Sequence, residues 1–174
     1  MIHYSELKLL NPAELKERSK SFTQEDWADL KDQRTFTVPE LAEEDNHVYF
    51  DTSDELKAYL LNNYVPSTKP WLAEEIAEHE SLHAKCALAM GVTGIRFSVN
   101  LNGRGVHTQI YSSVELPALA YGAIAMHPSD SERSEVDRGV LSFLGYVSRQ
   151  HVVDRVQRWN EQDNGLYIPE PEKK

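Results

Sequence analysis

The sequence contains one cysteine, Cys86, and no apolar run close to the ~18 residues that a membrane-spanning helix needs. A single cysteine excludes a disulfide framework and a cysteine-based zinc knuckle, and a reducing compartment is the simpler expectation. The first ten residues, MIHYSELKLL, lack the basic start and the long apolar stretch of a signal peptide. We therefore expect a soluble, cytoplasmic protein that has no membrane partner.

Positive charge is also scarce. The chain has 18 Lys and Arg residues against 28 Asp and Glu residues, which gives a formal net charge of −10. A protein that binds nucleic acid needs a basic face for the phosphates, so we expect no nucleic-acid partner. With 174 residues, 40% of them hydrophobic and 26% charged, the composition is that of a globular chain with a substantial core.

Glycine is absent from the first 90 residues, and that half of the chain predicts helices separated by prolines. Asn11-Pro12 is a typical helix start, and Thr23 is a typical N-cap before acidic residues. The alternating residues 47–51 predict a short strand, and residues 65–70 (VPSTKP) predict a linker. The expected helices of this half cover residues 12–19, 24–32 and 54–64.

The half that follows the linker predicts a long helix from Pro70 to about Met90, ended by Gly91. Two period-two segments joined through Asn102-Gly103 then predict a β hairpin. A small-residue helix is expected to lie almost wholly in the core, and Pro128 ends it. We expect the next helix to begin directly after Ser129 and a last amphipathic helix to follow it, at residues 130–145 and 147–160.

The long helix contains the sequence His-Glu-Ser-Leu-His at residues 79–83. With about 3.6 residues per turn, His79 and His83 lie on one helical face, where two imidazoles can occupy two corners of a zinc tetrahedron. Glu80 then faces the open coordination position and can take a proton from a zinc-bound water. The pattern fixes only three positions, so a charged helix that matches by chance is the competing interpretation.

A catalytic zinc has three protein ligands, so a third donor is needed. Asp130 is attractive because it opens a predicted helix just after Pro128 and Ser129, although an acidic residue is also favoured there by the helix dipole. His127 is nearly as good a candidate. The downstream candidates are His107, His127, Asp130, Glu132, Glu135, Asp137 and His151.

From Ile76 onward, the order of features resembles the peptidase domain of the FtsH family of zinc-dependent proteases. That family has His-Glu-x-Gly-His-Ala on a helix, and HESLHA matches it at His79, Glu80, His83 and Ala84. A β segment, a small-residue helix and an acidic helix follow in both. In the family, an aspartate that opens the acidic helix is the third zinc ligand, so the resemblance assigns this role to Asp130.

The resemblance implies a mainly α (α+β) fold: a helical zincin-like peptidase domain with a small β hairpin. Together with the linker at residues 65–70 and the polar C-terminal segment, it divides the chain into an N-terminal helical extension of unknown role (1–69), an FtsH-like zinc peptidase domain (70–162) and a flexible tail (163–174). The sequence departs from the family at Ser81-Leu82 and at Met126, where the family has a glycine-containing pair and a glutamate. These 174 residues contain no phosphate-binding loop, so activity without ATP is expected.

We therefore predict a zinc metalloendopeptidase that hydrolyses peptide or protein substrates with Zn²⁺ on His79, His83 and Asp130 and with Glu80 as general base. Two alternatives stay open: a catalytically inactive zinc-peptidase fold that acts as an adaptor, and a zinc-free helical interaction protein. Cys86 is expected to be a small core residue. The oligomeric state is not predicted.

Overall fold

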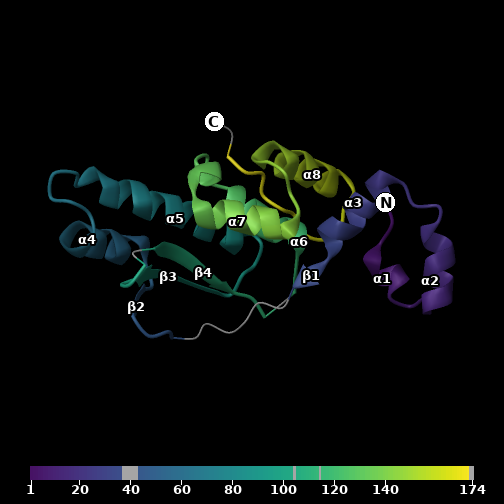
Figure 1. Ribbon diagram of the computed structural model, residues 1–174, viewed down its shortest axis with the longest axis horizontal. Coiled ribbons are helices and arrows are strands. Elements are labelled where there is room, and N and C mark those ends of the chain that lie inside the picture. Colours follow the sequence, from purple (N-terminus) through teal and green to yellow (C-terminus); the bar gives the residue numbers. More distant parts are fainter. Residues whose placement is uncertain (37–42, 104, 114, 173–174) are drawn as a thin grey trace.

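The structure is a computed structural model that describes residues 1–36, 43–103, 105–113 and 115–172, with the backbone alone at Arg133. It has a mixed α+β fold in which most of the regular structure is helical (Figure 1). In chain order the elements are α1 (Tyr4–Leu7), α2 (Pro12–Ser19), α3 (Gln24–Gln33), β1 (Thr35–Phe36), β2 (His47–Phe50), α4 (Ser53–Asn63), α5 (Trp71–Ala89), β3 (Gly94–Asn100), β4 (Val106–Tyr111), β5 (Leu116–Pro117), α6 (Ala118–Met126), the 3-10 turn η1 (Ser131–Arg133), α7 (Glu135–Leu144) and α8 (Arg149–Glu161).

Local signals explain where many of these elements begin and end. The Asn11 side chain accepts a hydrogen bond from the Glu14 amide at 2.9 Å, and the Glu14 carboxylate accepts one from the Asn11 amide at 3.0 Å. Gly91 ends α5 with a φ of 81°, in the left-handed region that glycine adopts without strain. The predicted helices at residues 12–19 and 24–32, the helix ending before Gly91 and the β hairpin are confirmed.

The larger sheet is antiparallel and has the order β2-β3-β4. Its strand β2 comes from within the predicted extension 1–69 and pairs with β3 from His47 opposite Asn100 to Phe50 opposite Phe97. Helices α4 and α5 pack on this sheet through a core of Leu56, Leu60, Ala73, Ala77, Ala84, Phe97 and Val99. Within the described residues, β4 is an edge strand, and α5 lies directly against it.

The second core surrounds α6, whose residues are almost all buried. The carboxyl-terminal end of α5, together with α7 and α8, packs around it. The segment predicted as a flexible tail lies against α8: Ile168 is fully buried, and the Asn160 side chain bonds its backbone N–H and C=O. No helix in the described part of the chain is both long and apolar enough to span a bilayer.

One element starts later than the sequence predicts. We expected a helix directly after Ser129, but residues 131–133 form a 3-10 turn and α7 begins at Glu135. Ser134 is its N-cap, and the Ser134 hydroxyl accepts a hydrogen bond from the Asp137 amide at 3.4 Å. Asp137, and not Asp130, therefore stands in the first turn of this acidic helix, and this difference decides the geometry of the site.

Candidate metal centre

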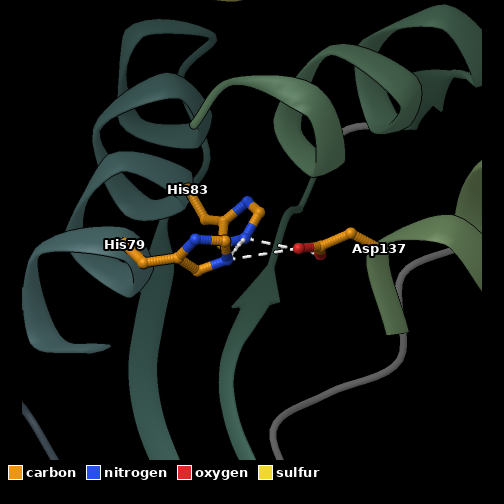
Figure 2. Close-up of side chains that lie close together, drawn as sticks. All are labelled: His79, His83 and Asp137. Atoms are coloured by element: carbon orange, nitrogen blue, oxygen red, sulfur yellow. Dashed lines mark hydrogen bonds and ion pairs between the residues drawn. The ribbon is translucent and has the colours of Figure 1, made fainter. Parts of the chain in front are cut away.

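Three side chains from two helices point at one another in the interior, as Figure 2 shows: His79 and His83 from α5 and Asp137 from α7. The two Nε2 atoms lie 3.0 Å apart. Asp137 Oδ2 is 3.2 Å from His79 Nε2, and Asp137 Oδ1 is 3.4 Å from His83 Nε2. Donors on a tetrahedral zinc are about 3.3 Å apart, given Zn–N bonds of about 2.0–2.1 Å, so this triangle has the size of a zinc site.

The outer nitrogen of each ring is held by an acceptor. His83 Nδ1 donates to the backbone carbonyl oxygen of Ile124 at 2.6 Å, and His79 Nδ1 lies 2.7 Å from Asp130 Oδ1. A carbonyl or carboxylate oxygen can only accept, so each Nδ1 carries the proton. In the neutral rings both Nε2 atoms therefore present lone pairs to the centre, as metal-binding histidines with such outer partners do.

With both rings neutral, two imidazole lone pairs and a carboxylate therefore face one another at the centre of the cluster. None of these groups carries a hydrogen atom that it could donate to the others. Such a cluster requires a cation or extra protons. Without a metal, burial opposes protonation, but the carboxylates of Asp137 and Asp130 outweigh it and raise the pKa of His79 to about 9. Burial likewise opposes ionisation of Asp137, yet its bonds to the two histidines lower its pKa to about 2.

Glu80 lies beside this cluster and is itself buried. Its Oε2 accepts a hydrogen bond of 2.6 Å from the Thr108 hydroxyl of β4, which also lies 3.0 Å from the Glu80 backbone oxygen. Burial raises the pKa of Glu80, and the neighbouring His83 and the Thr108 hydroxyl limit the rise. A carboxylate with a raised pKa, held in one orientation, is suited to general acid-base chemistry.

Two hollows meet at Glu80. One of about 220 Å³ is lined by Glu80, His83 and Asp137, with Tyr121 and apolar side chains of β4, α6 and α7. The other, of about 360 Å³, is lined by Glu80, His79 and Asp130, together with Tyr64 and Ile76. Both include Val106 at the start of the edge strand β4. Both hollows therefore lie beside the edge strand of the sheet.

The structure brings together three of the four residues that the sequence selected. His79, Glu80 and His83 share one end of the site, whereas Asp130 lies on the far nitrogen of His79 and its side chain is 55% exposed. The carboxylate that meets both Nε2 atoms belongs to Asp137, which the sequence offered only as one of several candidates. The spacing Ser134-x-x-Asp137, typical of a helix N-terminus, was the available signal for it.

The remaining candidates lie outside the cluster. His127 is half-buried and its pKa is lowered by burial, His107 lines the smaller hollow, and His151 Nδ1 accepts a hydrogen bond from the Val147 amide. Glu132 accepts a hydrogen bond from the Arg149 amide at 2.7 Å. Cys86 is buried, which raises the pKa of its thiol to about 12, and it is the core residue that the sequence predicted.

Comparison with protein-family models, with curated proteins and with solved structures found no match to this chain.

Proposed function

We propose that this chain is a zinc-dependent metallopeptidase that hydrolyses peptide bonds without ATP. One observation carries the proposal: the outer partners of His79 and His83 turn both Nε2 lone pairs toward the Asp137 carboxylate, beside a buried glutamate. Two imidazoles and one carboxylate form a ligand set of catalytic zinc sites that leaves a position for water. We propose His79, His83 and Asp137 as the ligands and Asp130 as the partner that orients His79.

The chain's own residues supply the proton transfers in this mechanism. A zinc ion bound there would lower the pKa of its water toward neutrality. Glu80 takes the proton of the attacking water and later gives it to the leaving amine. Thr108 holds Oε2, and among the described residues no hydrogen bond reaches Oε1, so Oε1 is the atom that we assign to the transfer.

The substrate would lie along β4. An extended peptide can pair with an exposed sheet edge, and β4 leads past both hollows to Glu80. This arrangement, with the ligand helix α5 against an edge strand, is what supports a zincin-like interpretation and the resemblance to the FtsH peptidase domain. We propose flexible segments and short peptides as the substrates, because an extended chain is what an edge strand can pair with.

Zinc stoichiometry and one variant test the proposal together. The purified protein should contain about one zinc per chain, and Glu80→Gln should keep that zinc while cleavage of a denatured protein substrate falls by at least ~10³-fold. Zinc with equal behaviour of wild type and Glu80→Gln in every cleavage assay would support the inactive adaptor. A protein that binds no zinc would be a helical interaction protein.

The assignment of the third ligand has a test of its own. Asp137→Asn should abolish zinc retention during dialysis, because the inner carboxylate is lost. Asp130→Asn should leave zinc bound but reduce the affinity about 10–100-fold, because only the outer partner of His79 changes. Competition with a chromophoric chelator measures both. The reverse order of effects would return the role of ligand to Asp130.

A further inference from the structure

Helices α1 and α2 lie at the opposite end of the molecule from α4 (Figure 1), and their side chains help to line a hollow. It measures about 830 Å³ and lies between α1, α2 and α3. Its apolar lining includes Tyr4, Leu7, Leu15, Phe22, Trp27 and Leu30. Trp27 is 54% exposed, and Tyr4 and Leu15 are each 38% exposed. Exposed aromatic side chains grouped around a hollow are typical of protein-binding surfaces.

Helix α2 forms one wall of this hollow and has no buried residue. Its N-terminal end is satisfied by the capping box of Asn11 and Glu14, and its Leu15 side chain lines the hollow. Among the described residues, only residues of the amino-terminal 34 line the hollow, so this wall is available to a partner. The described C-terminal segment does not supply one, because it packs on α8 instead.

The charge of the hollow is opposite to that of the chain. Its lining includes Lys8, Lys16, Lys31 and Arg34 and no Asp or Glu, in a chain with a formal net charge of −10. Lys31 is occupied, because its Nζ donates to the Gly145 carbonyl oxygen at 2.8 Å. Across the described ranges no ion pair joins Lys8, Lys16 or Arg34 to a carboxylate, although the outer face of the same helices pairs Arg18 with Glu6 and Lys20 with Glu17.

We propose that this hollow is a docking site for an acidic, amphipathic peptide segment of another protein. One or two large apolar side chains would enter between Leu15 and Trp27, and flanking carboxylates would pair with Lys8, Lys16 and Arg34. The apolar contacts provide the affinity, and the lysines select the sign of the partner's charge. The site is independent of the metal centre, so Glu80→Gln should bind the segment like the wild type.

Three fluorescent peptides of about twelve residues test this proposal by anisotropy. The first is a glutamate-rich helix former with leucine and phenylalanine at i and i+4. The second has lysine in place of glutamate, and the third has serine in place of the leucine and phenylalanine. Only the first should bind, and its affinity should fall with salt. Lys8→Glu with Lys16→Glu should weaken binding roughly tenfold. Leu15→Ala should weaken it about tenfold without altering the circular dichroism, since Leu15 lies on a helix with no buried residue.

Matched controls lie outside the hollow. Leu9→Ala replaces a leucine that is 86% exposed but does not line the hollow, and Lys69→Glu makes the same type of substitution once, on the loop between α4 and α5. Both should bind the acidic peptide like the wild type. The proposal is overturned if the acidic peptide does not bind, if the basic peptide binds equally, or if controls and hollow variants behave alike. Self-association of the chain that Leu15→Ala abolishes would instead identify a second copy as the occupant, which also overturns it.

Discussion

The cluster around Arg155 and the cluster around Asp137 both bury carboxylates, and they differ in where the positive charge comes from. In the first, Asp29 and Asp32 of α3 are almost fully buried, and Arg155 of α8 bonds both at 2.6 Å. Arg158 adds a second guanidinium to Asp29 at 2.8 Å. Each buried carboxylate thus has a permanently charged partner from the same chain.

The Asp137 cluster has no such partner in the described structure. Its carboxylate faces two imidazoles whose protons are turned outward, toward Ile124 and Asp130. The chain therefore neutralises the carboxylates of the Arg155 cluster with its own arginines, whereas the Asp137 cluster needs a proton or a metal ion as its counter-charge. A buried charged group that folding leaves without a counter-charge is a candidate for function. The Arg155 cluster, in which every carboxylate has its counter-charge, instead links α3 to α8.

The largest effect should come from breaking the complete cluster. Arg155→Ala leaves Asp29 and Asp32 buried without their shared guanidinium, which typically costs about 3–5 kcal/mol. Urea unfolding should measure this loss. Arg18→Ala, which removes an exposed partner of Glu6, is the control and should cost less than about 1 kcal/mol. Equal losses in the two variants would mean that the Arg155 cluster is no more than a surface ion pair.

The incomplete cluster should instead make stability depend on pH and on zinc. The folded pKa of His79, about 9, lies above the ordinary value of 6.5. In metal-free protein the stabilisation by protonated His79 is therefore complete below pH 6.5 and is lost as the pH rises through 9, up to about 3–4 kcal/mol at ~1.4 kcal/mol per pKa unit. Zinc binds the neutral imidazoles, so with zinc in excess stability should rise over the same range.

Thermal unfolding at pH 6 to 9, once with a chelator and once with excess zinc, measures how stability changes with pH in each condition. His79→Asn is the control: it should remove the gain in zinc and reduce the loss in chelator, leaving only the part due to His83, whose pKa, despite its burial, Asp137 also raises. Asp137 does not disturb this window, since its lowered pKa of about 2 places its own contribution at acid pH, where stability falls as the pH drops below the ordinary 3.8. A flat profile in chelator would show that the imidazoles do not share the Asp137 carboxylate.

The sequence predicted the parts of the fold that local signals determine. Caps at Asn11 and Thr23, the glycine stop at Gly91 and the hairpin around Asn102-Gly103 act over a few residues, and the structure confirms these elements. The pairs Asp29–Arg155 and His79–Asp137 are separated by 126 and 58 residues along the chain. No local pattern contains such pairs.

The choice of Asp130 shows why local signals were insufficient at the site. Pro128 and Ser129 look like a helix start, but the Glu132 carboxylate accepts a hydrogen bond from the Arg149 amide at the start of α8. This contact belongs to a residue 17 positions away and accompanies a 3-10 turn in place of the expected first turn. The helix then begins at Glu135, which moves the first-turn carboxylate from Asp130 to Asp137.

The smallest effect is expected from Thr108→Val, which tests the glutamate rather than the ligands. The variant removes the hydroxyl that bonds Glu80 Oε2 at 2.6 Å and keeps the shape of the side chain. Loss of one such bond should lower kcat about fivefold, equivalent to ~1 kcal/mol, with zinc retained. Because the Thr108 bond limits the raised pKa of Glu80, its loss should also move the acidic limb of the kcat/KM profile to higher pH. Thr93→Val, an exposed position just before β3, should change neither. An unmoved acidic limb in Thr108→Val would remove Glu80 from the role of base.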